Sequence, residues 1–137
     1  MTKLTAAHYC RVWNEIYDLP TVSLQHFIVY GPRIRSNMAI TNFVSRCLNG
    51  KPPVINGDGT QIRDFTIIDV IVPTNHTMLD TGDVDNEARD IGSTDNIVIK
   101  TLATTIWGEI DPLLELVYIN RFETDVEHTH GDVSKAR

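Results

Sequence analysis

The sequence predicts a single α/β domain over residues 1–137. Helical and strand patterns alternate in the order αβαβαβαβ with short connections, which is typical of an α/β domain. Residues 21–30 are apolar or β-branched at most positions, as in a strand that a parallel sheet buries on both faces. With 42% hydrophobic residues, the chain is long enough to form one compact core.

The first half contains two expected helices around this strand. Apolar side chains recur at helical spacing over residues 2–18, and Pro20 ends the helix because the residue before a proline avoids the α conformation. The strand at 21–30 ends at Gly31-Pro32. A second helix is predicted over 38–48, with Asn49-Gly50 as a left-handed end.

The second half is predicted to continue the alternation. Residues 67–80 read as a strand end that runs into a helix, and Pro73 should allow that helix to begin only near itself. Residues 81–87 are a polar loop, and 88–92 form a short strand. Amino-capping residues at 93–96 should begin an amphipathic helix over 97–110, before a last strand at 114–119.

Composition excludes several classes of partner. A net charge of −6 without a basic stripe argues against nucleic acid. No apolar run approaches the ~20 residues that span a bilayer, and the amino terminus lacks the apolar stretch of a secretory signal. We therefore expect a cytoplasmic protein without a membrane partner. Cys10 and Cys47 have no pairing motif and should be small, buried helix residues.

A glycine-rich turn is the most informative local feature. Gly57 and Gly59 flank Asp58, so the chain can adopt positive φ on both sides of an Asx-type turn between strands at 54–55 and 65–68. Arg63 follows closely. Its planar guanidinium could bind a phosphate or carboxylate of a ligand, but most arginines beside turns are solvated or pair with a neighbouring aspartate such as Asp64.

Residues 57–59 and 63–65 together resemble the GDG-x-x-x-RDF signature of nucleotide-sugar epimerases and dehydratases, in the extended branch of the short-chain dehydrogenase/reductases. The segments 30–33, 37–48 and 125–136 are similar to further motifs of these UDP-glucose 4-epimerase-like proteins. The resemblance implies the carboxyl-terminal part of a Rossmann-like epimerase fold. The glycine-rich dinucleotide-binding half would be lacking, because none of the eight glycines forms G-x-x-G-x-x-G.

The resemblance also implies roles for individual residues. Lys3 takes the position of the lysine in Tyr-x-x-x-Lys, which holds the nicotinamide ribose of NAD and lowers the pKa of the catalytic tyrosine. It would be a catalytic and cofactor-binding remnant, since the tyrosine falls two residues before Met1. Arg63 takes the position that contacts the substrate diphosphate. The other substrate-binding residues implied are Arg33, Asn37, Asn42 and Asp64.

The sequence departs from the family pattern at several polar positions. A substrate-binding asparagine is replaced by Ile28, a tyrosine by Ile67, and a second diphosphate arginine by Phe122, with Arg121 one position away. Apolar side chains there would leave a charged diphosphate partly unpaired. Binding of a nucleotide-sugar should therefore be weak or lost.

Two functions follow from this pattern. The first is a truncated epimerase/dehydratase-like protein that represents the nucleotide-sugar-binding half, binds no NAD on its own and is not catalytic alone. The alternative is half of a split or misassigned UDP-sugar 4-epimerase, active with an amino-terminal partner chain. The chain alone should form a homo-oligomer, aggregate or need such a partner, because strands without neighbours expose apolar surface. His128 and His130 invite a metal interpretation, but the family motif accounts for them, and we expect no metal site.

Overall fold

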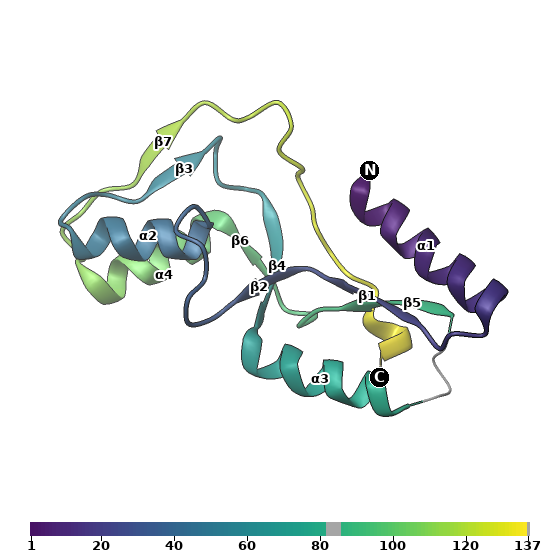
Figure 1. The fold of residues 1–137 in the computed structure, drawn as a ribbon. Helices are drawn as coiled ribbons and strands as arrows, with labels where there is room; N and C mark the ends of the chain where they lie inside the picture. Colours follow the sequence, from purple (N-terminus) through teal and green to yellow (C-terminus); the bar gives the residue numbers. More distant parts are fainter. Residues whose placement is uncertain (82–85, 137) are drawn as a thin grey trace.

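The computed structural model describes residues 1–81 and 86–136, and it confirms the predicted α/β class (Figure 1). The helices are α1 (Thr2–Tyr17), α2 (Ala39–Leu48), α3 (Ile68–Asp80), α4 (Ile99–Ile110) and the short 3-10 helix η2 (Val133–Ala136). The strands are β1 (Val22–His26), β2 (Ile28–Tyr30), β3 (Val54–Asn56), β4 (Ile62–Ile67), β5 (Glu87–Ile91), β6 (Asn96–Val98) and β7 (Val117–Ile119).

The strands form small, mostly parallel sheets. β1 pairs with β5 and β3 pairs with β7, both in parallel, while β4 lies between parallel β2 and antiparallel β6. The predicted strand at 21–30 is divided at Phe27 into two strands that belong to different sheets. The expectation that both of its faces are buried is wrong, since no residue of β1 or β2 is fully buried.

Two boundaries in the second half also differ from prediction. Helix α3 begins at Ile68 and contains Pro73 in its interior, because Ile71 and Met78 pack against Ile91 and this contact outweighs the hydrogen bond that proline cannot donate. Strand β6 was missed, and α4 begins after it without a side-chain cap. The expected capping residue Ser93 instead donates to Asp64.

The remaining boundaries agree closely. Helices α1 and α2 and strand β5 lie within a residue or so of their predicted ranges. The last strand is shorter than 114–119 and begins at Val117. Most of the predicted polar loop at 81–87 lies outside the described residues.

The hydrophobic core has two parts. Phe43, Ile55 and Ala103 join α2, β3 and α4 at one end, whereas Ile71, Met78 and Ile91 join α3 to β5 at the other. In Figure 1 the first group of elements lies to the left and α1, β1 and β5 lie to the right, with β2 and β4 between them. The central strands thus connect two separately packed regions.

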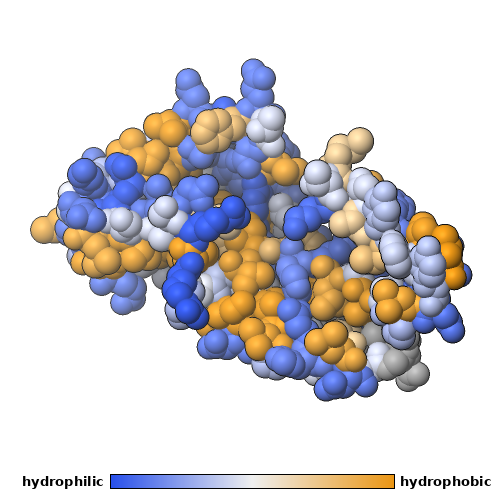
Figure 2. All heavy atoms as spheres, in the orientation of Figure 1, coloured by the Kyte–Doolittle hydropathy of each residue, from blue (hydrophilic) through white to orange (hydrophobic). Residues whose placement is uncertain are grey.

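Helix α1 buries none of its side chains. Trp13 and Tyr17 stack with ring centroids 4.5 Å apart, yet both are exposed, as are Leu4, Tyr9 and Ile16. Figure 2 shows hydrophobic residues at the surface in several places. Contrary to expectation, Cys10 of α1 is exposed, while Cys47 is buried as predicted. Within the described part of the chain, no helix is both long and apolar enough to cross a membrane.

Candidate functional site

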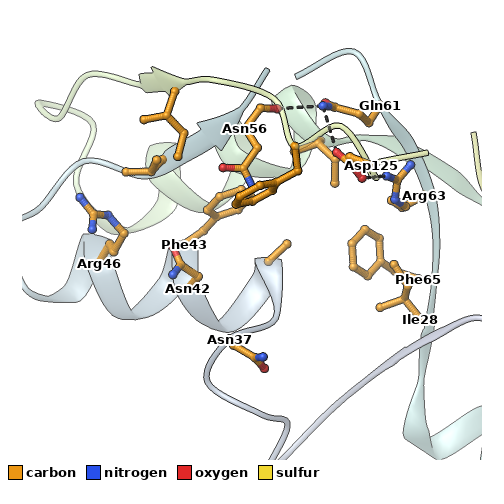
Figure 3. A pocket seen from close by; sticks show the side chains of 15 residues that line it. Ile28, Asn37, Asn42, Phe43, Arg46, Asn56, Gln61, Arg63, Phe65 and Asp125 are labelled. Carbon is orange, nitrogen blue, oxygen red and sulfur yellow. Dashed lines mark hydrogen bonds and ion pairs between the residues drawn. The ribbon is translucent and has the colours of Figure 1, made fainter. Parts of the chain in front are cut away.

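A cavity of about 460 Å³ lies between α2 and the strands that face it (Figure 3). Amide side chains, two arginines and one carboxylate share its wall with aromatic and aliphatic residues. Its lining residues are Ile28, Asn37, Ala39, Asn42, Phe43, Arg46, Val54, Asn56, Gln61, Arg63, Phe65, Ile99, Ile119, Phe122 and Asp125. A volume of this size is typical of small-molecule sites.

Arg63 projects from β4 into a set of acceptors that belong to the chain. Its Nη2 donates to Oδ1 of Asp125 at 2.6 Å and to the carbonyl of Val126 at 2.6 Å. Its Nη1 donates to the carbonyls of Ile62 at 2.8 Å and Glu127 at 3.3 Å. The side chain is only 11% exposed. The arginine thus pairs with an acid of the chain, and that acid is Asp125, not the adjacent Asp64. Its contact with a substrate diphosphate stays a prediction.

Gln61 completes the network on the other side of Asp125. Its Nε2 donates to the carbonyl of Asn56 at 2.8 Å and to Oδ2 of Asp125 at 3.3 Å, and the side chain is 3% exposed. The dashed lines in Figure 3 run from Asn56 through Gln61 and Asp125 to Arg63. The network ties β3 and β4 to the segment 121–129, which also bonds the backbone of Ile62.

The α2 wall carries a second arginine that sequence reasoning missed. Arg46 lies one turn after Asn42, so both side chains face the cavity from the same side of the helix. Its Nε donates to the carbonyl of Pro52 at 2.7 Å. Phe43, between them, belongs to the core. The spacing of four residues beside a buried aromatic was the signal that could have found Arg46.

The remaining predicted residues are distributed unevenly. Asn37 and Asn42 line the cavity with Arg63. Asp64, the next residue of β4, is fully buried and accepts hydrogen bonds from Thr66 and from the backbone and hydroxyl of Ser93, so it holds the turn after β5 and does not line the cavity. Arg33 is exposed in a left-handed conformation (φ 67°) and is not part of the wall.

Lys3 occupies a different part of the molecule. It stands in the first turn of α1 and lines a separate cavity of about 570 Å³ between α1 and β1. The structure therefore does not bring Lys3 to the cavity that holds Asn37, Asn42 and Arg63. A role in binding the nicotinamide ribose stays a prediction.

The glycine-rich turn has the predicted conformation. Gly57 and Gly59 have φ of 74° and 78°, and Asp58 accepts hydrogen bonds from the backbone N–H and hydroxyl of Thr60. These bonds stabilise the carboxylate and lower the pKa of Asp58 below its ordinary value. The turn connects β3 to β4, which belong to different sheets. Asn56 and Gln61, on the two sides of the turn, both line the cavity.

His128 and His130 lie in the closing segment, where the sequence invited a metal interpretation. His130 exchanges a hydrogen bond with Asn96, with 2.8 Å between Nδ1 and Nδ2. Over residues 1–81 and 86–136, no cluster of three or more histidine, cysteine or acidic residues could hold an ion.

Comparisons with known proteins show which family the chain resembles. A model of the NAD dependent epimerase/dehydratase family matches residues 1–92. The chain is 31% identical over its full length to an uncharacterised UDP-glucose epimerase of Bacillus subtilis and 33% identical over 99% of its length to a UDP-glucuronate 4-epimerase of Thermodesulfobacterium geofontis. It covers 43% and 42% of these relatives, respectively.

A solved structure of an epimerase has a fold similar to that of the chain. The UDP-glucuronic acid 4-epimerase of Bacillus cereus, in complex with UDP-glucuronic acid and NAD, superposes with a TM-score of 0.91 at 32% identity. The match covers 98% of the present chain and 43% of that protein. The chain thus spans less than half the length of the proteins it matches.

Proposed function

The chain belongs to the NAD dependent epimerase/dehydratase family, and on that premise we propose that its cavity binds a nucleotide-sugar and that the chain alone catalyses neither epimerisation nor dehydration. The observation that supports binding is the cavity itself, which combines amides, arginines and aromatic rings in a volume of about 460 Å³. The Bacillus cereus epimerase, which has a similar fold, was solved in complex with UDP-glucuronic acid.

The chemistry of the wall suits a nucleoside. Asn37, Asn42 and Asn56 each offer a carbonyl and an NH₂ group, which together match the mixed donors and acceptors of a base and ribose. Ile28 and Phe122 line the same cavity at two positions where the family pattern has an asparagine and an arginine. Because these side chains offer no polar contact, we expect affinity below that of a fully polar site.

NAD, when bound in this family, supplies a hydride acceptor, but the described residues do not fit its pyrophosphate. That group is usually held at a helix amino terminus after a glycine-rich turn. The residues that precede α1, α2, α3 and α4 are Met1, Met38, Ile67 and Val98, none of them a glycine. We therefore propose that the described residues alone do not bind NAD.

Calorimetric titration tests the proposal. The chain should release measurable heat with UDP-glucose and with UDP, and none with NAD. Saturable binding of NAD would contradict the cofactor assignment. Absence of any UDP binding at millimolar concentration would contradict the assignment of the cavity. Arg11→Gln, which changes an exposed α1 residue outside the cavity, is the matched control for the binding measurements.

One observation favours the alternative of a split or misassigned UDP-sugar 4-epimerase that is completed by an amino-terminal chain. Helix α1 exposes Leu4, Tyr9, Trp13 and Ile16, and β1 is paired only with β5 among the described strands. An amino-terminal partner would cover this surface. Coexpression with the amino-terminal half of the Thermodesulfobacterium geofontis relative should then yield a stable complex with epimerase activity. A monodisperse, thermally stable monomer of the isolated chain would contradict the need for a partner or a homo-oligomer.

A further inference from the structure

Arg46 carries hydrogen-bond donors that the described part of the chain leaves unused. Only its Nε is engaged, by the carbonyl of Pro52 at 2.7 Å. Within residues 1–81 and 86–136 it takes part in no ion pair, and its Nη1 and Nη2 groups have no hydrogen-bond partner. Neither group is shut off from solvent. Four N–H donors are therefore available to a ligand in the cavity.

The place of Arg46 in the cavity determines which part of a nucleotide these donors meet. Arg46 lines the wall one turn after Asn42 of α2, and Figure 3 shows it at the end of the cavity opposite Arg63. The family resemblance places Arg63 at the substrate diphosphate. A nucleotide whose diphosphate lies at β4 extends its nucleoside toward α2, so that the base ends beside Arg46.

The far end of a pyrimidine nucleotide differs chemically between uracil and cytosine. The group on C4 of the ring lies across from the glycosidic bond and is therefore the part of the base most distant from the ribose. In uracil this group is a carbonyl oxygen, which accepts hydrogen bonds, and in cytosine it is an amino group, which donates them. An arginine only donates, whereas the amides of Asn42 and Asn56 can turn to do either. Among these three side chains, Arg46 alone can distinguish the two bases.

We propose that Arg46 is a specificity-determining residue, which donates to the C4 carbonyl of the base and makes the chain select uridine over cytidine nucleotides. The assignment rests on the proposed function, because it concerns the base of a nucleotide in the same cavity. A hydrogen bond from a charged donor to this carbonyl is stronger than a neutral one. Cytosine would bring an amino group against the guanidinium and leave donors on both sides without an acceptor.

The test compares UDP with CDP, which share the ribose and the diphosphate and differ only at the edge of the base. In calorimetric titration the wild-type chain should bind UDP about ten-fold or more tightly than CDP. Arg46→Gln should abolish this preference, because a glutamine amide can serve either base. Arg46→Glu, which replaces donors by acceptors, should reverse the preference in favour of CDP. The control Arg11→Gln removes the same charge from exposed α1 and should change neither affinity.

The ratio of the two affinities separates recognition of the base from a structural effect. A merely structural defect in Arg46→Gln would weaken UDP and CDP by the same factor, and a preference for UDP that survives in this way overturns the assignment. A wild-type chain that binds the two nucleotides equally overturns it as well. Both results leave the proposed function standing, because a nucleotide is still bound. If Arg46→Gln does not fold, the reversal expected for Arg46→Glu decides. Failure of the wild-type chain to bind either nucleotide overturns the assignment and the proposed function together.

Discussion

Gly131 offers a test of the packing between the carboxyl-terminal segment and the central strands. The residue is buried, and a Cβ atom placed on it would lie 2.8 Å from Cζ and 2.9 Å from Cδ2 of Phe27. Real Cβ atoms do not approach other carbons so closely. Phe27 stands at the break between β1 and β2, where its N–H donates to the carbonyl of Ile91. The ring must therefore move if Gly131 is replaced by alanine.

The size of the effect follows from a comparison with Gly108. Overpacking by one methyl group costs about 1–3 kcal/mol of the free energy of unfolding. Gly108 lies in the interior of α4 with no atom within 4 Å of its hypothetical Cβ, and alanine there should stabilise by about 0.5–1 kcal/mol. The same chemical change at the two positions should thus give opposite signs, separated by about 1.5–4 kcal/mol.

Urea denaturation of the wild type, Gly131→Ala and Gly108→Ala, followed by circular dichroism and by the fluorescence of Trp13 and Trp107, measures this difference. Gly131→Ala should unfold at lower urea and Gly108→Ala at higher urea than the wild type, with similar slopes. A Gly131→Ala variant as stable as the wild type would show that the contact with Phe27 does not constrain the segment. Two shifts of the same sign would refute the argument.

Three further predictions concern other residues. Arg63→Gln should lower the free energy of unfolding by about 2–4 kcal/mol in urea titrations, because half-buried Asp125 then loses its ion-pair partner and keeps only the hydrogen bond from Gln61; an unchanged midpoint would contradict the structural role. Asp58→Asn should destabilise at neutral pH, where the lowered pKa of Asp58 makes the carboxylate favourable, and its difference from the wild type should shrink as the pH falls below 3.8. In a thiol titration with Ellman's reagent, exposed Cys10 should react at once. Cys47 should react only after unfolding, because burial, and to a lesser extent the charge of Asp111, raises the pKa of its thiol.

The sequence predicted those elements of the fold that depend on local pattern. The helices α1 and α2 have regular apolar spacing, and Gly57 and Gly59 permit the positive φ that the turn requires. Strand β6 and the early start of α3 could not be read locally. The former exists because β4 offers an edge to Asn96–Val98, and the latter because Ile71 packs on β5. In both cases tertiary contacts, and not the local conformational preference of the residues, determine the secondary structure.

The cavity likewise contains some residues that the sequence could identify and others that only the fold could. Asn37, Asn42 and Arg63 could be named because they lie in motifs that resemble those of a known family. The partner of Arg63 could not, since Asp125 stands 62 residues away and no spacing rule connects the two. Arg46 was missed because the family motifs give it no role. What local sequence indicated was a set of side chains, and what the fold decided was which of them remain available to a ligand.

Because α1 buries none of its side chains, we expect it to unfold separately from the rest of the chain. The helix packs mainly against β1, and the side-chain bonds at its end join Asn14 to Leu19 and Thr21 to Cys10. An isolated helix of 16 residues is only marginally stable in water. Its amide hydrogens should therefore exchange through local fraying, while those of α2 and α4 require opening of their shared core. We therefore expect α1 to be less stable than the region around α2 and α4, and the cavity beside α2 belongs to that more stable region.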